Sequence, residues 1–397
     1  MERFNFRFQF QQRAINDRLR IGLTGASTVM NQNPTYGYNF VLAYNMLPVY
    51  PVKLSDGSWY ENLGYDLGNP VHNIEMNKRE NRINRWYGSG DLQFTIIDGL
   101  DIKAMLYKSR NTNEYSQYYH SETDAGRDDG GYAYKYNTIN DKDLMEWTLN
   151  YDKTFKDLHK LQAMAGYSWE ENTDNDGFGL TVNNFFDDQL GWNNLTYAGM
   201  MKNGMKWVES GTIETVRNIS FYGRASYSYN SKYMLQATVR RDGSSVFGKG
   251  NQWGTFPSVS VAWNVTEEDF MKDQNIIDNL KLRLGYGVSG NAMGFGAYSA
   301  VATYGSTGNI DNGYVMLGAT KLANPDLKWE TTGMFNVGVD FGFFDGRLSG
   351  SIEYYNKVTK DLIWDYPVSS YSQPFGSISA NVGQITNNGV ELSLTAT

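Results

Sequence analysis

The stretch ERFNFRFQFQQ (residues 2–12) alternates strictly between two kinds of side chain: phenylalanine stands at every second position, between arginine, asparagine and glutamine. Because successive side chains of a β-strand point to opposite faces, it predicts a strand with one aromatic and one polar face. The same period of two recurs in RNISFYGRASYSY (217–229), NLKLRLGYGV (279–288) and MFNVGVDFGF (334–343).

This period also decides how a glycine motif is interpreted. Gly285, Gly287 and Gly290 have the G-x-G-x-x-G spacing of a dinucleotide-binding loop. That motif has meaning only where it follows a strand and opens a helix. Here Gly285 and Gly287 fall on the polar face of a strand, and no helical period follows. The sequence therefore argues against nucleotide binding.

Segments of this kind predict about thirteen strands, and their connectors differ in length. The expected strands span 2–12, 18–28, 84–97, 100–109, 143–154, 159–169, 215–230, 232–243, 254–264, 279–290, 328–343, 347–360 and 386–396. Tight turns at 16–18, 97–99, 230–232 and 344–347 alternate with long segments at 29–83, 110–142, 170–214, 291–327 and 361–385, while 243–253 and 265–278 are intermediate.

Short turns at one rim and long loops at the other are typical of a transmembrane β-barrel, with strands of about ten residues that are apolar outside and polar inside. The chain contains 29 Tyr, 20 Phe and 10 Trp, which suits aromatic girdles at the membrane interfaces. No run of about 18 apolar residues predicts a spanning helix. The opening MERFNFRFQFQQ lacks the apolar core of a signal peptide.

Composition excludes several functions. The chain has no cysteine, which excludes disulfides and thiolate chemistry, and its three histidines are scattered. A formal net charge of −8 argues against a nucleic-acid partner. We interpret acid pairs such as Glu267–Glu268 and Asp128–Asp129 as solvent-exposed residues of turns rather than as the two catalytic carboxylates of a glycosidase. We therefore expect no enzyme activity and no cofactor.

Five stretches of the second half occur in a fixed order. They are VRRDGSSVFGKGNQWGTFPSVSVAWNVTEEDFM (239–271), NLKLRLGYGVSGN (279–291), NPDLKWETT (324–332), YYNKVTKDLIW (354–364) and NVGQITNNGVELSL (381–394). Together they resemble SusC/RagA-type, TonB-linked outer-membrane proteins, from about residue 216 onward. Residues 1–215 match less distinctly.

The resemblance implies a part of an energy-coupled importer of glycan or peptide fragments in the Gram-negative outer membrane. It implies a SusD-like surface lipoprotein as a lid, the TonB complex and outer-membrane lipid as partners. Members of the family carry a signal peptide, a TonB box, a plug and a 22-stranded barrel. We expect residues 1–397 to be a central segment of that barrel, without the plug, the TonB box, the signal peptide or the C-terminal strands.

One long loop carries candidate ligand-binding residues. FFDDQLGWNNLTYAGMM (185–201) interleaves aromatic rings, which stack on sugars, with carboxylates and amides, which bind hydroxyls. The candidates are Phe186, Asp187, Asp188, Trp192, Asn193 and Tyr197. The favoured interpretation is that these residues pack the loop or contact the lid protein.

Two other groups of polar residues have weaker claims. Asp174 and Asp176 in TDNDGFG resemble the start of a calcium loop, but position 185, where an EF-hand needs glutamate, is Phe. A looser calcium site there stays open. A further polar set is expected to line the lumen or hold the plug: Arg224, Arg240, Lys281, Arg283 and Asp340.

Two alternatives to the importer remain. A passive porin-like barrel would share the strand pattern, and the plug with its TonB box would distinguish it. A secreted all-β binding protein or adhesin would stay soluble without detergent, whereas an apolar outer band requires it.

Overall fold

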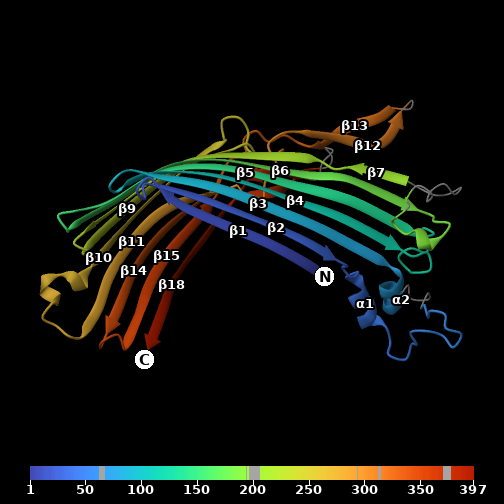
Figure 1. Cartoon of the computed structure of the whole chain (residues 1–397), viewed down its shortest axis with the longest axis horizontal. Helices are drawn as coiled ribbons and strands as arrows, with labels where there is room; N and C mark the ends of the chain where they lie inside the picture. Colours follow the sequence, from blue (N-terminus) through green and yellow to red (C-terminus); the bar gives the residue numbers. More distant parts are fainter. Residues whose placement is uncertain (62–67, 194, 196–205, 293, 312–313, 370–376) are drawn as a thin grey trace.

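The computed structural model describes residues 1–61, 68–193, 195, 206–292, 294–311, 314–369 and 377–397. Antiparallel strands dominate these residues and form one strongly curved sheet (Figure 1). The order of the main path is β1-β2-β3-β4-β5-β6-β8-β9-β10-β11-β14-β15-β18, and β7 pairs with β6 beside it. Each of the thirteen predicted spans overlaps one strand of this path, so the all-β antiparallel prediction is confirmed.

The strands of the main sheet fall into two length classes. Four are long: β3 (Lys78–Ile97), β4 (Leu100–Tyr119), β5 (Tyr132–Phe155) and β6 (His159–Asn183). The others are shorter: β1 (Glu2–Ala14), β2 (Leu19–Gln32), β7 (Lys206–Ser210), β8 (Ile213–Tyr229), β9 (Tyr233–Ser244), β10 (Trp253–Asn264), β11 (Ile277–Asn291), β14 (Glu330–Phe343), β15 (Leu348–Lys360) and β18 (Gln384–Ala396).

The sheet is an open arc in the part of the chain that the structure describes. Each strand pairs with its neighbours along the path, while β1 pairs with β2 alone and β18 with β15 alone. Figure 1 labels β1 near the N-terminus and β18 near the C-terminus, and no ladder joins these two edge strands. The predicted partial barrel is therefore confirmed as a wall rather than a closed cylinder.

One face of this wall is apolar and exposed. Leu284 on β11 lies opposite Val261 on β10 and Val337 on β14, and each of these three side chains is more than 40% exposed. Comparable outward residues continue along the sheet, from Phe6 to Leu392. A continuous apolar band of this size is unfavourable in water but is what the hydrocarbon core of a bilayer requires.

The opposite face is polar, and the glycines of the G-x-G-x-x-G motif belong to it. Strand β11 pairs with β14 through Gly290 to Asn291, so these glycines lie within a strand and open no helix. A Cβ on Gly285 would lie 2.5 Å from Asn336 Oδ1. Glycine there makes room for a neighbouring polar side chain, which agrees with the argument against nucleotide binding.

The segments that connect the strands lie at two opposite ends of the sheet, as predicted. One end carries the turns at 15–18, 98–99, 156–158, 230–232, 265–276 and 344–347. Asn230 and Ser231 both have positive φ, 48° and 57°, which matches the right-handed twist of the flanking strands. The segment 265–276 lies at this turn end, and 245–252 at the loop end.

The long segments contain more structure than the sequence predicted. Strands β4 and β5 extend through most of 110–142, leaving a loop of only 120–131. Two separate hairpins stand at the loop end, one of β12 (Thr303–Asp311) and β13 (Tyr314–Lys321), the other of β16 (Ile363–Pro367) and β17 (Ser377–Asn381).

The reason for the missed extensions lies in the outward side chains. Beyond the apolar band the outer face of β4–β8 bears ion pairs, with Lys108 Nζ 2.7 Å from Asp143 Oδ1 and Arg217 Nε 2.5 Å from Glu171 Oε2. The apolar alternation thus stops where the strands leave the membrane, although their hydrogen bonding continues.

Two helices lie in the connection between β2 and β3: α1 (Tyr38–Asn45) and α2 (Pro70–Met76). Among the described residues, no helix is both long and apolar enough to cross a membrane. Two small apolar cores lie at the loop end of the sheet. One consists of Tyr118, Ala133, Val182 and Phe185, the other of Val246, Phe247, Ala300 and Leu327.

Candidate functional site

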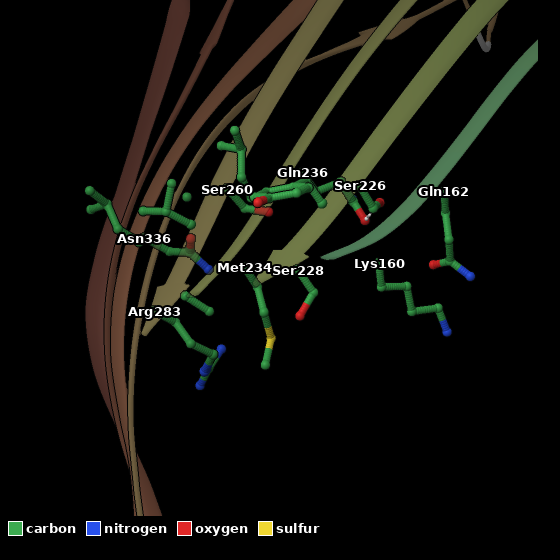
Figure 2. Close-up of a pocket in the computed structure, with 15 residues that line it drawn as sticks. Lys160, Gln162, Ser226, Ser228, Met234, Gln236, Ser260, Arg283 and Asn336 are labelled. Carbon is green, nitrogen blue, oxygen red and sulfur yellow. Dashed lines mark hydrogen bonds between the residues drawn. The ribbon is translucent and has the colours of Figure 1, made fainter. Parts of the chain in front are cut away.

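A polar cavity of about 470 Å³ opens on the inner face of the sheet toward the turn end. Polar side chains reach it from six adjacent strands, and Figure 2 shows them on the concave side of the curved ribbon. They include Lys160, Gln162, Ser226, Gln236, Arg283 and Asn336. The alternation explains this lining, because their neighbours Tyr227, Leu235 and Leu284 carry the outward apolar surface.

Arg283 organises the charges on one side of this cavity. Its Nε and Nη2 each donate to a carboxylate oxygen of Asp340 at 2.9 Å, and Nη2 also donates to Glu353 Oε2 at 3.3 Å. Asn336 Nδ2 donates to the other oxygen of Glu353 at 2.8 Å. The predicted lumen residues Arg283 and Asp340 therefore belong to one network, to which the structure adds Glu353 and Asn336.

Glycine makes this network possible. Gly338 lies directly opposite both Arg283 and Glu353 in the ladders on its two sides. A Cβ at Gly338 would lie 2.9 Å from Arg283 Nη2. The guanidinium therefore crosses over Gly338 to reach the next strand. Sequence alone could place Glu353 on the inner face, but this crossing depends on the register.

Arg240 forms a second inner-face cluster nearer the loop end. Its Nε donates to both oxygens of Asp242 at 2.8 Å, and Nη2 donates to Ser220 Oγ at 2.8 Å. The guanidinium also lies 5.3 Å from the centre of the Tyr222 ring. Arg224 and Lys281 lie on the same face as Arg240, as predicted.

Asp188 holds the loop that follows β6. Its carboxylate accepts from the Tyr118 hydroxyl at 2.5 Å, and from Ser121 N and Oγ at 2.8 and 2.6 Å. Burial raises the pKa of Asp188, but the bonds from Ser121 and Tyr118 and the nearby His120 outweigh it, so this pKa lies below its ordinary value. Burial and the bond to Asp188 raise the pKa of Tyr118.

The other loop candidates surround this anchor. Asp187 Oδ1 accepts from Gln189 N at 2.9 Å, and Phe186 is exposed. Trp192 packs against the Tyr118 core, and together with Asn193 it lines a cavity of about 530 Å³. Tyr197 lies outside the described residues.

This loop packs on the outer face of the wall. Tyr118 is separated from the outward Leu106 by an even number of positions on the regular strand β4, so both point outward. The residues of 186–193 are thus not brought to the lumenal cavity. Asp188 and Trp192 have packing contacts, as the favoured interpretation expects, and a ligand role for this set stays a prediction.

The two aspartates of the possible calcium loop contact neighbouring strands. The carboxylate of Asp174 accepts from Asn140 and Asn172, and Asp176 Oδ2 accepts from Thr212 Oγ1 at 3.1 Å. Within the described ranges, no group of three or more His, Asp or Glu side chains is arranged to hold a metal ion. The calcium site stays a prediction.

The sequence also matches a protein family along nearly its whole length. Residues 7–397 match the family described as TonB dependent receptor-like, beta-barrel. The chain belongs to this TonB-dependent receptor family. Membership places it in the outer membrane, as the strand pattern predicted.

Individual relatives of this TonB-dependent receptor chain are considerably longer than it is. The TonB-dependent receptor P3 of Formosa agariphila is 31% identical over 398 residues, which are 96% of this chain and 38% of P3. SusC of Bacteroides thetaiotaomicron is 34% identical over 218 residues, 54% of this chain and 22% of SusC. The chain therefore spans well under half of the curated relatives it matches.

Solved structures show the same fold. The RagAB peptide importer in its closed-closed state superimposes with a TM-score of 0.83 over 99% of this chain and 44% of that chain, at 24% sequence identity. The ferric-catecholate import receptor Fiu of E. coli superimposes with a TM-score of 0.53 at 11% identity. At these identities the likeness concerns the fold alone.

Proposed function

We propose that this chain forms the wall of a SusC-like, TonB-dependent outer-membrane importer for glycan or peptide fragments. The observation that carries the proposal is the division of the sheet into an apolar outer face and a charged inner face along thirteen consecutive strands. The RagAB importer, whose fold is similar, transports peptides according to its description, and SusC is a relative by sequence.

The inner face carries charged groups that a folded plug would contact. The Arg283–Asp340–Glu353 network and the Arg240–Asp242 pair present fixed charges toward the lumen. Such groups suit hydrogen bonding to a folded plug, because buried polar surfaces need partners. The plug, the TonB box and the closing strands would come from further sequence, as the greater length of the relatives allows.

The proposed partners follow from the two ends of the wall. The long connections and the two hairpins gather at the loop end, where a SusD-like lipoprotein would close as a lid. The turn end would face the periplasm, where the TonB complex acts on the plug. We propose no catalytic role for Arg240 and Arg283, which are paired with Asp242 and Asp340 in the wall.

Energy-coupled uptake is the property to test. The gene would be deleted in the native host and restored, and uptake of labelled oligosaccharides and labelled peptides measured with and without a protonophore. An importer requires both the gene and the proton-motive force. Uptake that depends on the gene but survives the protonophore would show a passive porin. Unchanged uptake, with protein that is extracted without detergent, would show a secreted binding protein.

A further inference from the structure

Beyond the membrane band, the inner face of β4 and β5 is covered by tyrosines. This surface, which we call the tyrosine wall, consists of Tyr115, Tyr119, Tyr132, Tyr134 and Tyr136. Tyr115 lies opposite Tyr136, and Tyr119 opposite Tyr132. The ring centres of these pairs are 5.1 and 5.8 Å apart, and those of Tyr134 and Tyr136 are 5.4 Å apart. The result is a continuous aromatic surface at the loop end.

These rings face inward by the same alternation that turns Leu106 outward. Tyr115 and Tyr119 are an odd number of positions from Leu106 on β4, which has no bulge in its ladder with β5. The wall therefore faces the same side of the sheet as the lumenal cavity, but nearer the loops. A solute entering from outside would meet it first.

Arg79 on β3 lies beside this surface without an acidic partner. Its guanidinium carbon is 4.5 Å from the ring centre of Tyr36 and 5.3 Å from that of Tyr119, whose hydroxyl accepts from Nη2. Its Nε is buried and has no partner. Across the described residues, no carboxylate lies within ion-pair distance of Arg79, whereas Arg82 on the opposite face pairs with Glu80 at 2.8 Å.

Two amide oxygens nearby are also without partners. Asn81 Oδ1 and Asn113 Oδ1 are buried and accept no hydrogen bond. Asn81 lies opposite Tyr115, and Asn113 is two residues before Tyr115 on the same face. Of the five such atoms found in the described part of the chain, three therefore gather at the tyrosine wall. Buried polar groups normally have partners, so the described residues alone leave this part of the wall incompletely hydrogen-bonded.

We propose that Arg79 and the tyrosine wall bind an oligosaccharide that carries carboxylate groups. A guanidinium binds a carboxylate through two parallel hydrogen bonds. Flat rings accept the apolar C–H faces of sugars, and sugar hydroxyls hydrogen-bond to the phenol groups at the ring edges. An acidic peptide would offer the carboxylate and N–H donors, but its backbone lacks the flat C–H faces of a sugar ring that stack on the tyrosines. The inference rests on the proposed function and specifies its substrate class.

Direct binding to the complete protein tests this. We would titrate the detergent-purified protein with oligouronates containing galacturonate, glucuronate or mannuronate, with their methyl esters, and with an oligoglutamate peptide. At least one oligouronate should bind about 10- to 100-fold more tightly than its ester, the range expected when a hydrogen-bonded charge is lost. Arg79→Gln should remove this preference, and Arg79→Lys should restore part of it.

Arg82→Gln is the matched control, because it removes a cation from the same strand but from the outer face. It should leave the preference for the acid unchanged. Equal binding of acid and ester, no binding of any oligouronate, tighter binding of the peptide, or an unchanged preference in a folded Arg79→Gln protein would each overturn the inference. Failure of the proposed function is distinguishable, because then cells would show no gene-dependent uptake of any probe even where binding is intact.

Discussion

Strands β3–β6 and strands β9–β18 of the main sheet belong to the same wall but differ in length and in outer surface. The first group has 20 to 25 residues per strand, the second 12 to 15. About 9–11 residues suffice for a tilted strand to cross a bilayer. The second group hardly exceeds the membrane, whereas the first extends well beyond it and carries the ion pairs, the outer loop core and the tyrosine wall. The surrounding medium, rather than the hydrogen bonding, decides which residues face outward.

The largest expected effect tests whether the two outer surfaces face different media. Leu284→Arg places a charge at the middle of the apolar band and should destabilise the folded protein by about 2–4 kcal/mol. Asn84→Arg, at an outward position of β3 beyond the apolar band, should change the free energy of unfolding by less than about 0.5 kcal/mol. Urea titration of the complete protein in lipid vesicles measures both. Similar losses for the two variants would contradict the comparison.

The same contrast explains what the sequence could predict. The spans 100–109 and 159–169 end where the outward residues become charged, at Lys108 and Glu171, because apolar alternation reports contact with lipid and not strand pairing. The inner charges Arg283 and Asp340 were predictable from the same alternation. Their bond to Glu353 was not, since it depends on which residues lie opposite Gly338. Nor could the sequence show that Arg79 lacks an anion, because that is a property of its spatial neighbours.

The second prediction concerns the loop attached to the outer face of the long strands. Asp188→Ala removes the acceptor of Tyr118 and Ser121 and should cost about 2 kcal/mol locally, because a buried phenol is left without a partner. Hydrogen exchange in residues 184–193 should increase while exchange in β9–β18 stays the same. Asp187→Ala is a suitable control, because its carboxylate bonds within the loop. Equal protection in both variants would show that Asp188 is not the anchor.

Acid should weaken the same attachment. The pKa of Asp188 is lowered in the folded protein, so its contribution is complete above the ordinary value of 3.8 and is lost as the pH falls through the lowered pKa. Tyr118 stays protonated throughout, since its pKa is raised. After correction for the intrinsic pH dependence of amide exchange, the protection of residues 184–193 should therefore be constant from pH 7 to about pH 5 and fall only below about pH 4. A loss of protection between pH 7 and pH 5 would show that a group other than Asp188 controls the attachment.

A smaller effect is expected for the ion pair among the shorter strands. A double-mutant cycle with Arg283→Met and Asp340→Asn should give a coupling of about 1 kcal/mol, because the two-bond geometry is good but the side chains are about a third exposed. The outward pair Lys108–Asp143, more exposed and linked through a flexible lysine, should give a smaller coupling. Both couplings would be measured by urea unfolding. A larger value for Lys108–Asp143 would reverse the order.

The smallest effect distinguishes two glycines, one in each group of strands. A Cβ on Gly338 would meet the guanidinium of Arg283 at 2.9 Å and displace it from Glu353, so Gly338→Ala should destabilise by about 0.5 kcal/mol. A Cβ on Gly88 in β3 would have no neighbour within 4 Å, so Gly88→Ala should stabilise by a similar amount, about 0.5 kcal/mol, through the reduced freedom of the unfolded chain. In an Arg283→Met background, Gly338→Ala should no longer destabilise the protein, because no guanidinium then has to cross over residue 338. A penalty that persists there would mean that Gly338 is required by the backbone and not by the arginine that crosses it.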